Sequence, residues 1–133
     1  MSSNDSRLVD TANKTQSPAR EITPHQVART KPLPLMIDIR TEEEFLHGHI
    51  AGAEQINQDE LAPRVREALP ELATPILVYC ALGNEAPAAA EELVRIGYRN
   101  VFSLKGGLRN WLEAGGTVDC SKSSSIMFDR RKA

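Results

Sequence analysis

A short apolar run that leads directly into a cysteine constrains the fold of this chain more than any other segment. Residues 75–79, Pro-Ile-Leu-Val-Tyr, show no polar alternation, and Cys80 follows them. A strand with this pattern is buried on both faces, which is typical of a parallel sheet covered by helices on each side. Further short strands are predicted at 35–39, at 101–104 and, with a weaker pattern, at 53–56.

Helical patterns separate these strands. Thr23 precedes a proline at a helix start, and Thr41 with Glu44 has the spacing of a capping box. The predicted helices cover 24–29, 41–47, 59–69, 88–96 and 108–114, and Thr117-Val118 is expected to add an edge residue or two. Strands that alternate with helices form βαβ units, so an α/β fold with a parallel sheet is expected.

Length and composition predict one domain between two tails. The chain has 133 residues, enough for a single core. We expect a disordered N-terminal tail at 1–20, a folded domain at 21–119 and a flexible C-terminal tail at 120–133. The sequence shows no signal peptide and no apolar run long enough to cross a bilayer. A cytoplasmic protein with two free cysteines is therefore expected.

The charge distribution argues against nucleic acid as a partner. Residues 21–120 carry nine Lys/Arg against fifteen Asp/Glu, within a net charge of −2 for the whole chain. Nucleic-acid binding requires a basic face, and none is visible. His25 and His47 have no companions at metal-ligand spacing, so we expect neither a metal nor a cofactor. The expected state is a monomer without a membrane partner.

Cys80 is the candidate nucleophile. It lies at the end of the apolar strand, and the loop Ala81–Glu85 leads from it into a helix. Free backbone N–H groups and the positive end of that helix can point at the sulfur and favour its ionised form. Ligands of parallel α/β sheets bind outside the carboxyl ends of the strands, where Cys80 lies. A buried structural cysteine is the alternative.

Three sequence blocks resemble the rhodanese family of sulfurtransferases. The blocks are Ile37–Ala53, Cys80–Ala86 and Gly97–Trp111, and together the resemblance spans residues 22–118. It implies a single-domain rhodanese-like fold with a five-stranded parallel sheet and helices on both faces. It also implies that Cys80 takes a sulfane sulfur from a donor such as thiosulfate or a persulfide. The resulting Cys80 persulfide passes the sulfur to cyanide or to a thiol, either of a small molecule or of a protein.

The resemblance assigns roles to several residues. Asp38 and Arg40 match the family's Asp-x-Arg pair and are expected to support the site, with Glu44 as a partner of Arg40. Independently of the resemblance, Lys105 and Arg109 flank the Gly106-Gly107 turn and are candidate anion contacts, although an ordinary surface role is equally open. The loop that binds substrate is formed by Ala81, Leu82, Gly83, Asn84, Glu85 and Ala86. Gly83 lets the chain curl around the sulfur without a side-chain clash.

Three residues outside this site draw narrower predictions. His49 is interpreted as a hydrogen-bonded structural histidine, and Trp111 as a core residue with a local acceptor for its indole N–H. Cys120 is expected to be an exposed thiol, and a role in resolving an oxidised Cys80 is the alternative.

Glu85 departs from the family pattern and separates the functional alternatives. Many rhodaneses have arginine there, and a carboxylate repels dianionic thiosulfate, so weak use of thiosulfate is expected. One alternative is a rhodanese-like module with little catalysis, which binds or regulates a partner. Phosphatases and arsenate reductases of this architecture need a longer loop that ends in arginine, whereas Ala86 stands at that position. The sequence therefore disfavours the phosphatase and arsenate reductase alternatives.

Overall fold

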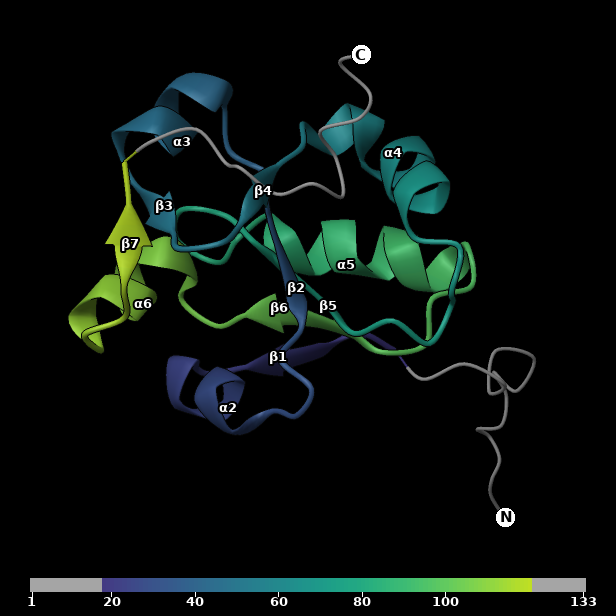
Figure 1. Cartoon of the computed structure of the whole chain (residues 1–133), viewed down its shortest axis with the longest axis horizontal. Helices are drawn as coiled ribbons and strands as arrows, with labels where there is room; N and C mark the ends of the chain where they lie inside the picture. The colour runs from purple at the N-terminus through teal and green to yellow at the C-terminus, as the bar shows by residue number, and fades with distance from the viewer. Residues whose placement is uncertain (1–17, 121–133) are drawn as a thin grey trace.

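The main sheet has five parallel strands. The computed structural model describes residues 18–120 and orders the strands β1-β6-β5-β2-β4, with β5 in the centre (Figure 1). The family resemblance predicted this sheet, and the prediction is confirmed. The strands are β1 (Arg20–Ile22), β2 (Leu35–Asp38), β4 (Glu54–Gln55), β5 (Ile76–Tyr79) and β6 (Val101–Leu104).

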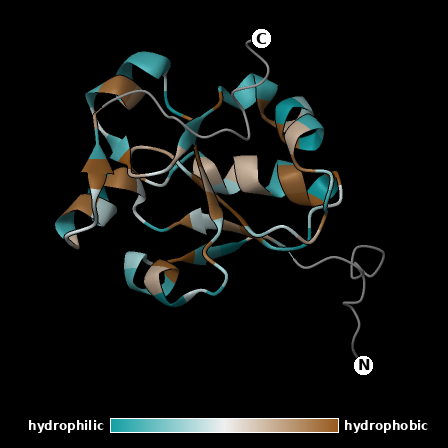
Figure 2. Ribbon diagram, in the orientation of Figure 1, coloured by the Kyte–Doolittle hydropathy of each residue, from teal (hydrophilic) through white to brown (hydrophobic). Residues whose placement is uncertain are grey.

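Helices cover both faces of the sheet. One buried apolar cluster joins the sheet to α4 and α5, and a second joins the opposite face to α2, α3 and α6. Apolar residues line the strands and the inner helix faces, while the outer faces are mostly hydrophilic (Figure 2). The helices are α2 (Pro24–Arg29), α3 (Glu42–His47), the 3-10 turn η2 (Gln58–Glu60), α4 (Leu61–Ala68), α5 (Ala86–Arg95) and α6 (Gly107–Glu113).

Strand β5 determines which way Cys80 faces. Successive side chains of a strand point to opposite faces of the sheet. Leu77 and Tyr79 accordingly pack in the cluster with α2, α3 and α6, whereas Val78 and Cys80 pack in the cluster with α4 and α5. All four side chains are buried. The cysteine therefore points toward α5, the helix that follows it in the chain.

The fifth strand lies at the N-terminal side rather than at Thr117-Val118. Strand β1 pairs with β6 and begins at Arg20, inside the segment expected to be a tail. Only Ile22 of its three residues is buried, so the apolar pattern is too short to predict a strand. Val118–Asp119 instead form β7, which pairs antiparallel with β3 (His49–Ile50) in a separate small sheet.

Three sequence-based expectations concern the two tails, membrane-spanning helices and metal sites. The tails at 1–17 and 121–133 lie outside the described residues. Within residues 18–120, no helix is both long enough and apolar enough to cross a membrane. That same span holds no group of three or more His, Cys, Asp or Glu side chains that could bind a metal ion.

Candidate active site

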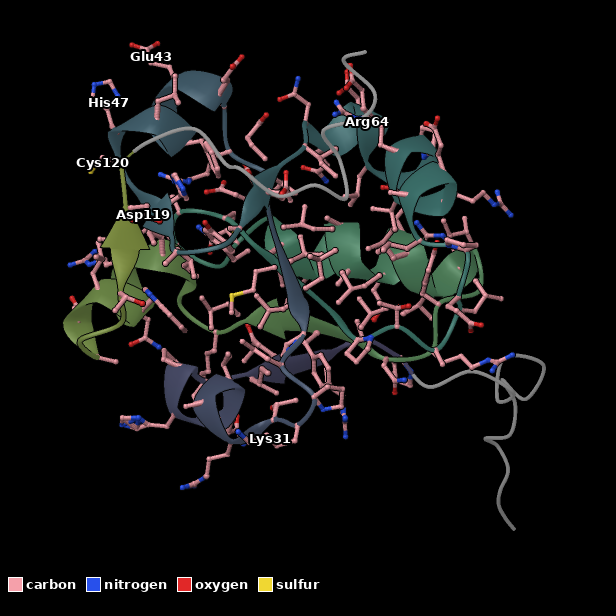
Figure 3. All side chains as sticks on the ribbon, viewed as in Figure 1. Lys31, Glu43, His47, Arg64, Asp119 and Cys120 are labelled. Atoms are coloured by element: carbon pink, nitrogen blue, oxygen red, sulfur yellow. The ribbon has the colours of Figure 1, made fainter. Side chains whose placement is uncertain are left out.

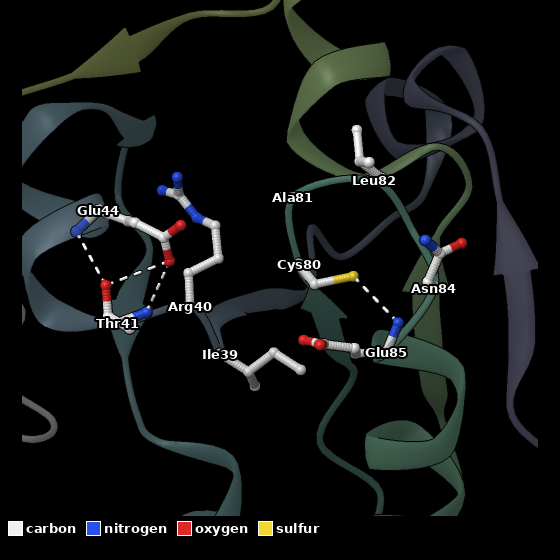
Figure 4. Close-up of a pocket in the computed structure, with 9 residues that line it drawn as sticks. All are labelled: Ile39, Arg40, Thr41, Glu44, Cys80, Ala81, Leu82, Asn84 and Glu85. Carbon is white, nitrogen blue, oxygen red and sulfur yellow. Dashed lines mark hydrogen bonds between the residues drawn. The ribbon is translucent and has the colours of Figure 1, made fainter.

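Backbone N–H groups surround the sulfur of Cys80. Its Sγ accepts N–H groups from Gly83 at 3.2 Å, Glu85 at 3.4 Å and Ala86 at 3.4 Å, the Glu85 contact being drawn in Figure 4. Helix α5 begins at Ala86, so the positive end of a ten-residue helix faces the same sulfur. Three donors and a helix N-terminus stabilise negative charge on the sulfur, which is the requirement for a thiolate nucleophile.

The start of helix α6 forms hydrogen bonds to the first residues of the Cys80 loop. The backbone N–H of Leu108 donates to the Cys80 carbonyl at 2.9 Å, and that of Arg109 donates to the Ala81 carbonyl at 3.1 Å. Gly107 makes this approach possible because a Cβ there would lie 2.6 Å from both carbonyl oxygens. Its φ of +63° also lies in the left-handed region that favours glycine. The loop is therefore supported by backbone contacts from a segment distant in sequence.

Gly83 packs against the turn at Gly106-Gly107, where helix α6 begins. Its φ is +90°, and a Cβ added to it would lie 2.9 Å from the Gly106 backbone nitrogen. The prediction that glycine is needed for the tight curl is confirmed, with the additional reason that two backbone segments touch here. A larger residue at Gly83 would separate the loop from the turn.

A pocket of about 350 Å³ opens in front of Cys80. Its two sides come from the segment after β2 with the start of α3, and from the Cys80 loop (Figure 4). Strands β2 and β5 are neighbours, so the pocket lies at their carboxyl ends, where parallel sheets bind ligands. The lining residues are Ile39, Arg40, Thr41, Glu44, Cys80, Ala81, Leu82, Asn84 and Glu85.

Arg40 is held by Asp38 rather than by Glu44. Its Nη2 donates to Asp38 Oδ2 at 2.8 Å and to the Gly48 carbonyl at 2.6 Å, and its Nε contacts both Asp38 oxygens. Burial alone would lower the pKa of Arg40, but the bonded Asp38 carboxylate raises it above its usual range. The expected Glu44 partnership holds only as a charge interaction that raises the pKa of Arg40, because Glu44 Oε1 accepts the backbone N–H and hydroxyl of Thr41. That capping box holds Glu44 at the start of α3.

Tyr79 ties the end of β5 to β3. Its buried hydroxyl accepts the backbone N–H of Ile50 at 3.0 Å. Burial raises the pKa of Tyr79, and the neighbouring Asp38 carboxylate raises it further, so the phenol stays neutral. Tyr79, the residue before Cys80, is thus fixed by a hydrogen bond to the small second sheet.

Removing this hydroxyl should destabilise the fold. In Tyr79→Phe the N–H of Ile50, a residue that is 1% exposed, loses its acceptor. An unsatisfied buried donor costs about 1–3 kcal/mol, and we expect the free energy of unfolding to fall by about that amount. Urea denaturation at neutral pH measures the change. A loss below about 0.5 kcal/mol would contradict a structural role for this bond.

The structure brings most of the predicted site residues together, but not all of them. Arg40 and the loop residues Ala81, Leu82, Asn84 and Glu85 line the pocket with Cys80. Lys105 and Arg109 are exposed and are not among the lining residues, and the Arg109 side chain is directed at Glu113.

Sequence reasoning missed Ile39 and Thr41 as lining residues and treated Glu44 as a capping-box residue and a partner of Arg40, not as part of the pocket lining. All three follow β2 directly or lie in the first turn of α3. The signal that could have found them is the strand order. Once β2 is known to lie beside β5, the residues that follow each strand must face one another.

Three further residues lie away from the pocket lining. His49 is buried, and its Nδ1 contacts the Phe45 carbonyl at 2.7 Å, so the structural interpretation is confirmed. Trp111 donates to the Thr117 carbonyl as predicted, but its ring is only partly buried. Cys120 is exposed, and its Sγ contacts the His47 carbonyl at 3.5 Å near the end of α3 (Figure 3).

Comparison with known proteins places this geometry in a family. Residues 23–114 match the model of the rhodanese-like domain. A Pseudomonas putida protein named thiosulfate sulfurtransferase GlpE is 36% identical over 94 residues, which cover 69% of this chain and 84% of that protein.

Solved structures agree with that assignment. A rhodanese-related protein from Thermoplasma volcanium superposes with a TM-score of 0.66 at 29% identity, covering 77% of this chain and 99% of that one. Thiosulfate sulfurtransferase from Pseudomonas aeruginosa gives a TM-score of 0.67 at 31% identity, covering 77% of this chain and 20% of that one. The family match includes the segment after β2, the start of α3 and the Cys80 loop, which together line the pocket. This chain belongs to the rhodanese-like domain family.

Proposed function

We propose that this protein is a sulfurtransferase that carries a sulfane sulfur atom as a persulfide on Cys80. The observation that carries the proposal is the ring of N–H groups from Gly83, Glu85 and Ala86 around Sγ, at the mouth of a pocket. Membership of the rhodanese-like family supports it, as do curated relatives named thiosulfate sulfurtransferase.

The reaction has two steps. The Cys80 thiolate attacks the sulfane sulfur of the donor, the bond between that sulfur and the donor breaks, and the donor leaves as sulfite or as a thiolate. A thiolate or cyanide acceptor then attacks the outer sulfur of the persulfide, and the Cys80 thiolate is released. Negative charge lies on the cysteine sulfur or its persulfide throughout, so the same N–H groups stabilise each state.

The proposal extends to the surroundings of the site. Asp38 and Arg40 support the pocket wall, while Lys105 and Arg109 would contact only a substrate that extends beyond the lining. We further propose a monomer in the cytoplasm, in which the folded domain expected at 21–119 begins one residue earlier, at Arg20 of β1, and has a tail on each side. The donor and acceptor are small molecules or sulfur-carrying proteins.

Persulfide formation is the direct test. The reduced, folded protein is mixed with thiosulfate or with a low-molecular-weight persulfide and analysed by mass spectrometry. We expect a gain of about 32 Da, one sulfur atom, on the peptide that contains Cys80. The absence of this adduct with every donor would overturn the proposal.

Glu85 should limit the use of thiosulfate. Its carboxylate lines the pocket, and its own backbone nitrogen lies 3.4 Å from the Cys80 sulfur. In Glu85→Arg a repulsive charge becomes attractive toward the dianion, so kcat/KM for thiosulfate should rise by roughly three- to tenfold after solvent screening. Steady-state assays with cyanide as acceptor measure this ratio.

The matched control is Glu67→Arg, which makes the same charge reversal at an exposed position on α4. This control should change kcat/KM for thiosulfate by less than about twofold. If Glu85→Arg leaves the ratio unchanged or lower, the electrostatic explanation is wrong.

A further inference from the structure

The charged side chains around Cys80 do not suit an anion. Among the described residues that line the pocket, Arg40 is the single cation, while Glu44 and Glu85 are carboxylates. Arg40 also contacts the buried Asp38 carboxylate through Nε and Nη2, so its charge is already balanced. The pocket in front of the sulfur therefore has an excess of negative charge.

Glu44 contributes a charge that is present at neutral pH. Hydrogen bonds from Thr41 hold its pKa below the usual range, and the charge of Arg40 lowers it further. One of its oxygens, Oε1, accepts both bonds from Thr41. Glu44 is thus ionised and fixed on the side of the pocket formed by α3 (Figure 4).

Glu85 contributes a second charge from the opposite side. Its side chain lines the pocket with Cys80, and Figure 4 shows it extending from the start of α5 toward the side of the pocket that holds Ile39. Within residues 18–120 this carboxylate has neither an ion-pair nor a hydrogen-bond partner. It is the charge in the pocket that a ligand would have to neutralise.

We propose that the sulfur carrier of this pocket is the persulfide or thiol of a β-aminothiol, with an ammonium group two carbons from the sulfur. The proposal rests on the proposed function and names its substrate class. The Glu85 backbone is held on Sγ and the residue lines the same pocket, so a short aminoethyl arm on a carrier whose sulfur meets Cys80 can extend toward the Glu85 carboxylate. Glu44 adds attraction from the other side, and neutral or anionic carriers gain neither contact.

The transfer step balances without a further reactant. The Cys80 thiolate attacks the outer sulfur of the carrier persulfide, R–S–SH, and a new S–S bond forms at Cys80. The S–S bond of the carrier breaks, and the aminothiol leaves as its thiolate. The proton stays on the transferred sulfur or exchanges with water, and the number of electrons is unchanged.

Thiol-specific probes of different charge can test this preference without turnover. Methanethiosulfonates that carry 2-aminoethyl, methyl or 2-sulfonatoethyl groups present a cation, a neutral group and an anion, with one common leaving group. Cys80 attacks the divalent sulfur that bears the variable group, the bond from that sulfur to the sulfonyl sulfur breaks, a mixed disulfide forms, and methanesulfinate leaves. The full chain with Cys120→Ser limits the reaction to Cys80. Each rate constant is divided by that for a free small thiol, which removes intrinsic reactivity.

The cationic probe should react faster than the neutral one by roughly two- to fivefold, and the anionic probe should react more slowly by a similar factor. Glu85→Gln should bring both ratios to within about 1.5-fold of unity, and the charge of Glu44 accounts for the difference that remains. Glu67→Gln, an exposed carboxylate on α4, should leave both ratios unchanged. Equal normalised rates in the wild type, or ratios that survive Glu85→Gln, would overturn the proposal.

Sulfur transfer to thiols gives a second readout. The Cys80 persulfide is formed with a neutral donor, and its loss is followed with cysteamine, 2-mercaptoethanol or 2-mercaptoethanesulfonate at equal thiolate concentration. We expect the persulfide to be lost fastest with cysteamine, more slowly with 2-mercaptoethanol and most slowly with 2-mercaptoethanesulfonate. A protein that forms the persulfide but shows no charge order overturns this inference alone. A protein that forms no persulfide with any donor overturns the proposed function, and this inference with it.

Discussion

Replacing Cys80 with serine should abolish persulfide formation and lower sulfurtransferase turnover by roughly 10³-fold or more. The hydroxyl is a much weaker nucleophile toward sulfur, and it cannot form a persulfide. Serine has nearly the same size, and the three N–H groups that contact Sγ can still donate to its oxygen, so the fold should be retained. Mass spectrometry and a cyanide-linked assay measure the two losses, and circular dichroism checks the fold.

Cys120→Ser is the matched control. Cys120 is exposed and contacts the His47 carbonyl rather than the pocket, so its replacement should leave both the adduct and the turnover unchanged. A sulfur adduct that persists in Cys80→Ser and disappears in Cys120→Ser would place the chemistry on Cys120 and contradict the role of Cys80.

Gly107→Ala should cause a large loss of stability. The added Cβ would lie 2.6 Å from two carbonyl oxygens, those of Cys80 and Ala81, at a φ of +63°. Neither oxygen belongs to a flexible side chain, so the loop and helix α6 must separate. We expect the free energy of unfolding to fall by about 3 kcal/mol or more. Urea denaturation measures it, and the reaction rate of Cys80 with a neutral thiol reagent should fall in the folded protein.

Gly115→Ala separates backbone strain from the steric clash. Gly115 has a φ of +85°, similar to that of Gly107, but a Cβ there would meet nothing within 4 Å. This variant should lose only about 1 kcal/mol, the usual cost of a left-handed non-glycine residue. Equal losses in the two variants would show that the contact between Gly107 and the Cys80 loop carries no stability.

The parts of the site that follow from local sequence could be predicted. The run Ile76–Tyr79 is apolar throughout, so its burial on both faces and the strand-end position of Cys80 follow from the pattern. The capping box of Thr41 and Glu44 is likewise a local signal, and both of its hydrogen bonds form. Helix α5 begins at Ala86, two residues before the predicted start.

The remaining features depend on which distant segments meet. Strand β1 is short and two of its three residues are exposed, so its pairing with β6 becomes visible only in the sheet. The contacts from Leu108 and Arg109 to the Cys80 loop involve backbone atoms, which no side-chain pattern reveals. The acidic lining was only half predicted, because Glu44 reaches the pocket through the pairing of β2 with β5.

The contact between α6 and the Cys80 loop also orders events during synthesis. The carbonyls of Cys80 and Ala81 receive their hydrogen bonds from Leu108 and Arg109, which the ribosome adds much later. Until those residues leave the exit tunnel, the reactive loop lacks the support that aims its N–H groups at the sulfur. A nascent chain that ends before Gly107 therefore carries Cys80 without the two hydrogen bonds from α6, and the loop is supported only after α6 has been synthesised.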